Sequence, residues 1–378
     1  MKICVVSLFT PEIADYALRI AHDKSDYCAI HGYDFICPTQ RISDGSRPAS
    51  WDKILLLQKH LPEYDYLFWT DADSIIMDFS IRLERFIDAY SELIISKDHN
   101  AVNAGNFFIR NTPRVHEFLK DVYAQTDLIN HCWWDNAAII RLLDQNPPPL
   151  TVNYIPQVAI NSYPHLYVPG DFILHFPGLK NLTDIVSACG TTDLVIPTRQ
   201  HFPTMFRKLG LLKRGAEIGV QAGDFAASIA ARWPGEELFL VDQWKFDPMY
   251  TDISNVPGDQ QELLYKSVLN RFSMDDRVTV IRGESTAAAS RFSDGHLDWV
   301  YIDANHRYEF VLNDLHTWYP KVRRGGMLAG HDYLDGELPE GVFGVKRAVH
   351  EFCKTKSVCI RQTKEPEWPS WYIVKREQ

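Results

Sequence analysis

Apolar, strand-like segments alternate with amphipathic, helix-like segments along most of this chain, and this alternation most constrains its fold. In the first half, predicted helices over residues 11–31 and 49–61 separate the predicted strands ICVVSLF, HGYDFICPT and LFWTDADSIIMD. Strands that alternate with helices form a mostly parallel sheet whose faces are covered by the helices. The sequence therefore predicts an α/β fold.

Two domains are expected, because 378 residues are many for a single hydrophobic core. The apolar periodicity is lost among small and polar residues around CGTTD and then begins again. The predicted strands of the second half include AEIGV, ELFLVDQW, RVTVIRG, LDWVYIDAN and GGMLAGHDY. We predict a first domain over 1–186, a linker over 187–202 and a second domain over 203–378, with no internal repeat.

The composition argues against several classes of protein. Hydrophobic residues at 46% and charged residues at 23% are typical of a globular protein. The net charge of −10 comes with no large basic patch, so no nucleic-acid partner is expected. No apolar run approaches the roughly 18 residues of a membrane span, and the first apolar run is predicted to be a buried strand. Seven scattered cysteines without a C-x-x-C pair favour reduced thiols and a cytoplasmic location. The sequence leaves the oligomeric state open.

Asp71 and Asp73 follow the apolar run LFWT, two residues apart. In an extended segment such residues point to the same side, and paired carboxylates suit a hard cation such as Mn2+ or Mg2+ that can hold a diphosphate. Because Asp-x-Asp triplets are common by chance, the surrounding sequence decides. His175 can complete the coordination of Mn2+, while Gly178 lets backbone approach phosphate and Lys180 adds positive charge. The alternative is that His175 is a surface histidine in a turn.

Five segments in fixed order resemble one enzyme family: DKSDYCAIHGYDF, SWDKILLLQKHLPEYDYLFWTDADSIIMD, NAGNFFIRN, WWDNAAIIRLL and ILHFPGLK. Over about residues 1–182 the chain resembles the metal-dependent retaining glycosyltransferases that include α-galactosyl-, α-xylosyl- and α-mannosyltransferases. The resemblance implies a GT-A fold, a UDP- or GDP-sugar donor, a glycan or glycoside acceptor, and Mn2+ bound by Asp71, Asp73 and His175. It places Lys180 at the donor diphosphate and Lys53 near the nucleotide. The sugar pocket would be lined by Asn103, Gly105 and Asn106, with Asp135 and Asn136 facing the transferred sugar.

The mechanism of a retaining transfer is left open by the sequence. It needs either a nucleophile beneath the anomeric carbon or a same-face attack stabilised by the leaving phosphate. Asp135 is the candidate for the nearest carboxylate, and a helix N-cap is its alternative role. Relatives are expected to carry Asp-Gln at this place, so the shorter amide of Asn136 is a departure from the family pattern.

In the second half, AEIGVQAGD contains G-x-x-x-G rather than G-x-G-x-x-G, which disfavours NAD. Asp242 ends the next predicted strand, where it can bind the two hydroxyls of a ribose; the alternative is a plain strand–turn–helix with glycines needed for packing. Over about residues 203–378 the chain resembles class I S-adenosylmethionine-dependent methyltransferases, which have a Rossmann-like fold. The resemblance implies that Glu217, Gly219 and Gly223 cradle the methionine end of the cofactor. Asp242 would bind its ribose, with Glu284 and Ser285 beside adenine.

VYIDANHRY and AGHDY place Asp303 and Asp332 at the ends of two predicted strands, where a parallel sheet brings them side by side. This resembles the Mg2+-dependent O-methyltransferases that act on catechols and sugars, and implies a Mg2+ held by Asp303 and Asp332. His306 is then the expected general base, since an imidazole with a pKa near neutrality suits removal of a hydroxyl proton. His331 is the rival base, a surface role is the alternative for His306, and no third metal ligand is evident beside Asp332.

These observations predict a bifunctional enzyme in which a glycosyltransferase is joined to an O-methyltransferase. The transferred sugar would be methylated afterwards, because fusion raises the effective concentration of the first product near the second site. One alternative is a glycan-binding scaffold whose first half has lost turnover, with only the methyltransferase active. Another is that the first half merely positions the glycan for methylation.

Overall fold

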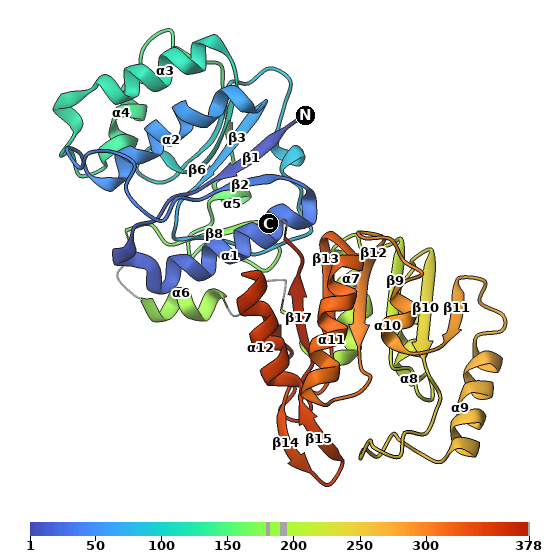
Figure 1. The fold of residues 1–378 in the computed structure, drawn as a ribbon. Helices are drawn as coiled ribbons and strands as arrows, with labels where there is room; N and C mark the ends of the chain where they lie inside the picture. The colour runs from blue at the N-terminus through green and yellow to red at the C-terminus, as the bar shows by residue number, and fades with distance from the viewer. Residues whose placement is uncertain (179–181, 190–194, 377–378) are drawn as a thin grey trace. The chain divides into compact units, whose positions relative to one another are not determined.

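The chain forms two compact units, Met1–Asp193 and Leu194–Gln378, each built around its own sheet (Figure 1). The computed structural model describes residues 1–178, 182–189 and 195–376. The predicted α/β fold in two domains is confirmed. The boundary between the units falls inside the predicted linker, 187–202, and helix α6 (Leu182–Cys189) extends into its beginning. The limits 1–186 and 203–378 remain predictions.

The first unit contains a six-stranded sheet in the order β2-β1-β3-β6-β5-β7. Three of its neighbouring strands run parallel, as the alternation of strands and helices predicts. The sheet is nevertheless mixed, because β6 is antiparallel to both of its neighbours. A separate antiparallel pair is formed by β4, which follows β3 in the chain, and β8, which comes from the end of the first unit. The strands are β1 (Ile3–Val6), β2 (Asp34–Ile36), β3 (Tyr66–Thr70), β4 (Ser74–Ile76), β5 (Leu93–Lys97), β6 (Val102–Arg110), β7 (Val152–Ile155) and β8 (Ile173–His175).

Helices cover this sheet from two sides (Figure 1). On one side α2, α3 and α4 pack into a core that includes Trp51, Leu57 and Phe118. On the other, α1 packs with β4 and β8 through Ile20, Ile75 and other buried apolar side chains. The helices are α1 (Ala14–His31), α2 (Asp52–His60), α3 (Pro113–Ala124), α4 (Trp134–Leu143), α5 (Gln157–Ile160) and α6, with 3-10 turns at Pro11–Ile13, Ala49–Trp51, Leu61–Glu63, Leu83–Phe86 and Thr126–Leu128.

The second unit contains a seven-stranded sheet in the order β11-β10-β9-β12-β13-β17-β16. Its first five strands are parallel, and β17 enters antiparallel beside β13. The sheet is doubly wound, with a switch in direction between β9 and β12, and ligands bind at such a point in α/β sheets. The strands are β9 (Arg214–Ile218), β10 (Glu237–Asp242), β11 (Val278–Arg282), β12 (Leu297–Ile302), β13 (Val322–Gly330), β16 (Arg361–Gln362) and β17 (Trp371–Val374).

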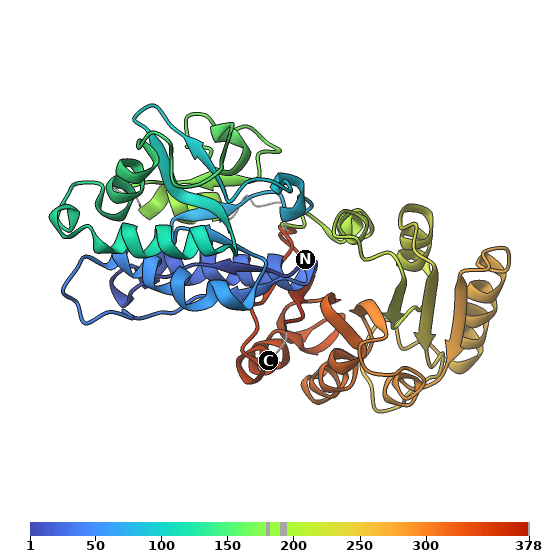
Figure 2. The ribbon, with the colours of Figure 1, turned by 90° about the horizontal axis from the view of Figure 1, so that it is seen from above.

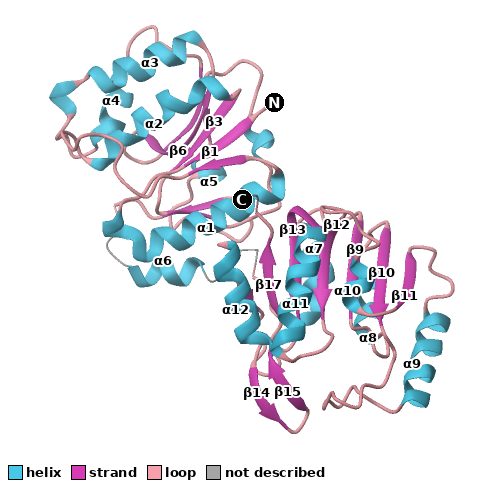
Figure 3. Cartoon of the chain, viewed as in Figure 1, coloured by secondary structure: helices cyan, strands magenta, loops and turns pink. Residues whose placement is uncertain are grey.

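Alternate residues of β12 face opposite layers of helices, as the period of two in a strand requires. Trp299 stacks on Phe206, and Tyr301 contacts Phe225, on the side covered by α7 and α8. Figure 2 shows α10, α11 and α12 on the other side of this sheet, and a hairpin of β14 and β15 is marked in Figure 3. The helices are α7 (Phe202–Lys208), α8 (Asp224–Arg232), α9 (Gly258–Arg271), α10 (Ser285–Ala289), α11 (Tyr308–Trp318) and α12 (Val345–Lys356), with 3-10 turns at Arg199–His201 and Tyr319–Lys321 and the hairpin strands at Asp335–Leu338 and Gly341–Gly344.

One segment with the composition of a turn is a strand in the structure. AVNAGNFFIRN reads as a glycine-containing turn that leads into a strand, but Asn103 and Asn106 both lie inside β6. The reason is the pairing of β6 along two neighbours, which extends the strand over the glycine. No helix among the described residues is long and apolar enough to cross a bilayer.

Candidate active sites

The chain turns sharply between β3 and β4, and this turn carries Asp71 and Asp73. The N–H of Ser74 donates to the carbonyl of Asp71 at 3.0 Å, which closes the turn. The expectation that an extended segment points both carboxylates to one side is therefore wrong. The turn nevertheless brings them together, because ligand atoms of Asp71, Asp73 and His175 all lie within 4.8 Å of one another.

His175 ends β8 directly opposite Ser74, and its two ring nitrogens have different partners. Nδ1 lies 2.5 Å from the amide oxygen of Asn161, and Nε2 lies 3.3 Å from Oδ1 of Asp73. The Asn161 amide is oriented by Asn106, which donates to its oxygen, and by Ser96, which accepts from its nitrogen. An amide oxygen can only accept, so Nδ1 donates to Asn161, and Nε2 is the ring nitrogen that faces the carboxylate.

In a neutral imidazole with its proton on Nδ1, Nε2 is an acceptor, and it repels the carboxylate of Asp73 unless a cation lies between them. The donor set of two carboxylates and one imidazole nitrogen suits Mn2+, and an oxygen that accepts from the outer nitrogen is the usual support of a ligating histidine. The three side chains therefore fit a divalent cation.

Lys53 links Asp135 to the turn at residues 71–73, which we call the metal turn. Its Nζ lies 3.3 Å from Oδ1 of Asp71 and 3.0 Å from Oδ2 of Asp135, and it donates to the carbonyl of Ala104 at 2.9 Å. Burial lowers the pKa of Lys53, but the charges of Asp135 and Asp71 outweigh burial and raise it. Burial raises the pKa of Asp135, opposed by the charge of Lys53. Asp135 does not cap its helix, because the N-cap position is Trp133.

The asparagines expected in the sugar pocket are held by protein groups. Asn136 accepts from the N–H of Ala104 at 2.9 Å and donates to the carbonyl of Val102 at 3.1 Å, so both ends of its amide hold β6. Asn103 donates to Asp98 and to the Tyr163 hydroxyl. Asn106 is fully buried and bonds to Ser74 as well as to Asn161.

A cavity of about 670 Å³ joins these groups and has the size of a small-molecule site. Its rim includes Trp133 and Trp134, which are 42% and 45% exposed. Asn106 lies behind the lining, and Lys180 lies outside the described residues. The predicted residues that line the cavity are Lys53, Asp71, Asp73, Asn103, Gly105, Asp135, Asn136, His175 and Gly178.

Lys24 is a buried residue of this region that the sequence did not single out. It lies in α1 with no exposed surface, and its Nζ donates to the carbonyl of Asp71 at 2.6 Å and approaches that of Thr70 at 3.3 Å. Burial lowers the pKa of Lys24 to about 8. Lys24 therefore holds the main chain of the metal turn from beneath.

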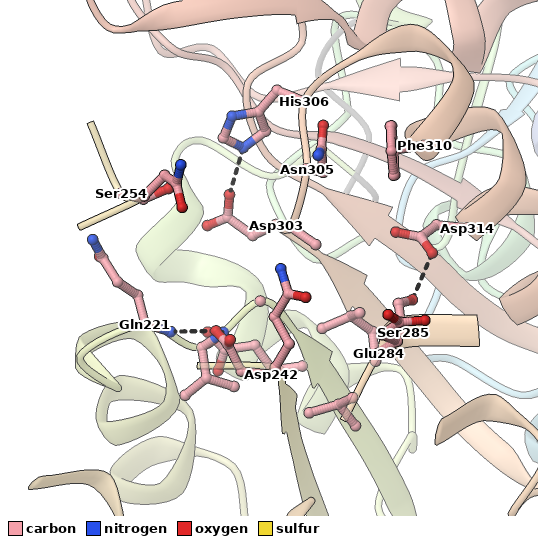
Figure 4. A pocket seen from close by; sticks show the side chains of 18 of the residues that line it. Gln221, Asp242, Ser254, Glu284, Ser285, Asp303, Asn305, His306, Phe310 and Asp314 are labelled. Carbon is pink, nitrogen blue, oxygen red and sulfur yellow. Dashed lines mark hydrogen bonds and ion pairs between the residues drawn. The ribbon is translucent and has the colours of Figure 1, made fainter. Parts of the chain in front are cut away.

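The second unit has a cavity of about 680 Å³ at the carboxyl ends of its parallel strands (Figure 4). The candidate cofactor residues that line it are Glu217, Gly219, Asp242, Glu284 and Ser285, and their roles remain predictions. A side chain at Gly219 would lie 1.9 Å from the carbonyl oxygen of Asp303, so only glycine allows this close approach. Gly223 is not in the lining: it precedes α8 and packs towards Val268 of α9.

Asp242 shapes the turn that follows β9. Its Oδ2 accepts from the backbone N–H groups of Val220 and Gln221 at 2.8 and 2.9 Å, and its Oδ1 accepts from that of Trp244 at 2.8 Å. Figure 4 shows the bond to Gln221 at the edge of the cavity. Oδ2 therefore already accepts two hydrogen bonds, whereas Oδ1 accepts one and keeps room for a further donor such as a ribose hydroxyl.

Across the cavity, Ser285 is tied to a carboxyl group that the sequence did not single out. Its hydroxyl donates to Oδ1 of Asp314 at 2.5 Å (Figure 4). It also accepts from the Trp318 indole at 2.8 Å. Burial raises the pKa of Asp314 to about 6.

Asp303 and Asp332 meet at the strand ends, with His306 between them. Nε2 of His306 lies 3.5 Å from Oδ1 of Asp303 and 3.0 Å from Oδ2 of Asp332, and the ligand atoms of the three residues lie within 4.8 Å of one another. Nδ1 of His306 lies 3.0 Å from Asp252, a residue that the sequence did not single out. The three ligand atoms fit a divalent cation, so His306 is either the third ligand that was not evident from the sequence or, with Nε2 free of the cation, a base.

The outward oxygens of both carboxylates have partners of their own. Nη2 of Arg199 lies 2.6 Å from Oδ2 of Asp303, and Nδ1 of His331 lies 2.6 Å from Oδ1 of Asp332. Burial opposes ionisation of Asp303, but the charge of Arg199 outweighs it and holds the pKa of Asp303 well below its usual range.

The acidic neighbours of His306 favour its protonated form, and a divalent cation bound at Nε2 would displace that proton. Burial lowers the pKa of His306, but hydrogen bonds to Asp252 and Asp303 and the charge of Asp332 outweigh burial and raise it to about 10.

Two family models match the chain, one in each unit. The galactosyl transferase GMA12/MNN10 family matches residues 4–90 and 88–185, and a methyltransferase domain matches residues 216–333. Both resemblances expected from the sequence are thereby confirmed.

Similar proteins include a probable glycosyltransferase 3 of Oryza sativa subsp. japonica, 32% identical over 108 residues, which are 25% of this chain and 23% of the relative. Xyloglucan 6-xylosyltransferase 1 of Arabidopsis thaliana is 31% identical over 109 residues, 26% of this chain and 24% of the relative. The chain thus spans about a quarter of the length of these relatives.

Among solved structures, a glycosyltransferase involved in the glycosylation of the major capsid of PBCV-1 is 16% identical, with 52% of this chain and 100% of that chain covered and a TM-score of 0.44. An O-methyltransferase from Bacillus cereus in complex with SAH is 16% identical, with 48% of this chain and 82% of that chain covered and a TM-score of 0.34.

Proposed function

Since a glycosyltransferase-family region and a methyltransferase domain lie in one chain, we propose that the protein transfers a sugar from a nucleotide donor and then methylates a hydroxyl of that sugar. The observation that carries the first activity is the convergence of Asp71, Asp73 and Nε2 of His175, with Nδ1 held by Asn161. The acceptor is a glycan or glycoside, and the methyl donor is S-adenosylmethionine.

In the first site, Mn2+ would be held by Asp71, Asp73 and His175 and would neutralise charge that develops on the departing diphosphate. Lys53 keeps Asp71 and Asp135 in fixed positions by pairing with both. The buried carboxylate of Asp135 thereby stays close to the metal turn, where the sugar of the donor would lie. The amide of Asn136 holds β6 in register, so its contribution to the site is positional.

Hydrolysis of nucleotide sugars in the presence of Mn2+ tests the first activity. We expect turnover of a UDP- or GDP-sugar by the unaltered chain, and a loss of at least about 100-fold in Asp73→Asn. Asp121→Asn is the matched control, because Asp121 is an exposed carboxylate on α3. A chain that binds glycans but never turns over a nucleotide sugar would instead support the scaffold alternative.

In the second site, Asp242 would bind the cofactor ribose, with Glu217 and Gly219 at the methionine end and Glu284 and Ser285 beside adenine. A Mg2+ held by Asp303 and Asp332 would grip the substrate oxygen and make its hydroxyl more acidic. His306 and His331 both contact Asp332 and are the two candidate groups for moving the hydroxyl proton.

Comparison of His306→Asn with His331→Asn separates their roles. We expect His306→Asn to lower methyl transfer by at least about 100-fold while binding of S-adenosylhomocysteine persists. A larger loss in His331→Asn would assign proton transfer to His331. If neither variant changes methyl transfer, the proposed site is wrong.

A further inference from the structure

Arg199 enters the methyl-donor cavity from the stretch that joins the two units in the chain, and no cofactor role follows for it from the sequence motifs. We propose that Arg199 binds the α-carboxylate of the methionine portion of S-adenosylmethionine and so positions the donor for transfer. This inference rests on the methyl transfer proposed above and names a positioning residue for it.

The first support is where the Arg199 side chain lies. It lines the cavity together with Glu217, Gly219 and Asp303, the region expected to hold the methionine end. In Figure 4, Asp303 and His306 lie across the cavity from Glu284 and Ser285, the residues expected beside adenine. Because Nη2 of Arg199 lies 2.6 Å from Asp303, the guanidinium belongs to the end of the cavity that is remote from adenine.

The second support is hydrogen-bonding capacity that the protein leaves unused. Nε of Arg199 is buried and has no hydrogen-bond partner among the described residues. Oε2 of Glu217 is likewise buried and unpartnered, on a side chain that is 1% exposed. Buried polar atoms without partners are rare and costly, and they are common where a ligand is to supply the partner.

The two unused groups have opposite chemistry. Arg199 offers a donor on a positive group, and Glu217 offers an acceptor on an acidic group. A ligand that satisfies both carries a carboxylate and an ammonium together, as the methionine portion of the donor does. With the cofactor bound, the charges of ionised groups balance. Three positive groups, the Arg199 guanidinium and the ammonium and sulfonium of the cofactor, face the three carboxylates of Glu217, Asp303 and the cofactor.

The guanidinium is held in place by its surroundings. Its carbon lies 4.3 Å from the centre of the Phe225 ring and 5.3 Å from that of Tyr301, so aromatic faces cover it. The backbone is fixed too, because the N–H of Arg199 donates to Glu365 at 3.0 Å and the carbonyl of Pro197 accepts from Lys364 at 2.9 Å. A fixed planar fork suits a carboxylate better than a flexible ammonium would.

Binding of matched cofactor analogues to the full chain tests the inference. The probes are S-adenosylhomocysteine and its decarboxylated analogue, which has the same thioether and amine but no carboxylate, measured by calorimetry. We expect the unaltered chain to prefer S-adenosylhomocysteine by at least about tenfold. In Arg199→Met we expect that preference to fall to within about twofold, with affinity for the decarboxylated analogue unchanged.

Controls separate this role from a structural one. Arg214→Met removes a guanidinium that pairs with Glu237 on β10, and should leave the preference intact. Asp303→Asn removes the partner of Arg199 but keeps the guanidinium, and should also retain the preference. Equal losses for both analogues in Arg199→Met, or an unchanged preference, would overturn the inference. Failure of the unaltered chain to bind either analogue would instead contradict methyl transfer itself, and with it this role of Arg199.

Discussion

His175 and His306 are arranged alike in the two units. Nε2 of His175 lies beside Asp73, and Nε2 of His306 lies between Asp303 and Asp332. Each histidine has Nδ1 held by an oxygen of a residue elsewhere in the chain, Asn161 in one case and Asp252 in the other. An outer acceptor of this kind sets the orientation of an imidazole and raises its basicity as a ligand.

Replacement of Asn161 tests this support at the first site. Asn161→Leu removes the acceptor for Nδ1 while all three ligands remain, so we expect Mn2+ affinity to fall by about 10- to 100-fold. Electron paramagnetic resonance of free Mn2+ measures the change, in a chain that also carries Asp303→Asn so that the second cluster contributes nothing. An unchanged affinity would show that His175 needs no outer partner.

The raised pKa of Asp314 predicts how the stability of the second unit depends on pH. Its folded pKa of about 6 exceeds the ordinary 3.8, so folding favours its protonated form. The stabilising contribution of this group is complete below about pH 4 and is lost as the pH rises through about 6. A shift of about two pKa units corresponds to a cost of about 3 kcal/mol at neutral pH, as an upper bound.

Asp314→Asn should therefore stabilise the second unit at about pH 7.5 and have little effect at about pH 4, because the amide is neutral at both. Scanning calorimetry measures this gap, which is the difference in unfolding temperature between Asp314→Asn and the unaltered chain. The transition that shifts upward with S-adenosylhomocysteine identifies the second unit. A gap that does not change with pH would contradict the raised pKa.

At the scale of elements, β6 and β8 meet at the first metal site through Gly105. A Cβ at Gly105 would lie 2.3 Å from Cε1 of His175, too close for any real contact. The absence of a side chain in β6 is thus what lets the imidazole of β8 reach the metal turn.

Gly105→Ala should displace His175 and lower Mn2+ affinity by at least about tenfold, although no ligand is altered. Electron paramagnetic resonance of free Mn2+ measures the affinity of this variant, as it does for Asn161→Leu. Gly258→Ala is the matched control, since its Cβ would meet nothing within 4 Å. If Gly105→Ala bound Mn2+ normally, the close approach would be relieved without moving the imidazole.

At the scale of the whole molecule, each unit has its own core, cavity and acidic cluster. A covalent link between two such units raises the concentration of the first product around the second site, whatever their arrangement. The sequential proposal depends on this link.

Asp71→Asn should abolish sugar transfer and, with unglycosylated acceptor, methylation as well. Methylation should return when glycosylated acceptor is supplied, whereas Asp303→Asn should block methylation of both. Transfer of labelled methyl groups from S-adenosylmethionine measures each case. Methylation of unglycosylated acceptor that ignores Asp71→Asn would contradict the sequence of steps.

The order of motifs along the chain was enough to predict two α/β domains and most of the candidate residues that line the two cavities, whose roles remain predictions. Strands, helices and glycine turns leave local periodic signals, and His175 stood out because it follows a strand within an ordered set of motifs. The α/β fold and both family resemblances followed from these signals.

Only the tertiary structure decided which groups support those residues. Asn161, Asp252 and Arg199 act through contacts that are 14, 54 and 104 residues away in the chain, and no local pattern marks such partners. The same holds for NAGN, which has the composition of a turn but is a strand because β3 and β5 pair with it on both sides. Local chemistry thus identified candidate ligands, while long-range packing set their protons, partners and neighbours.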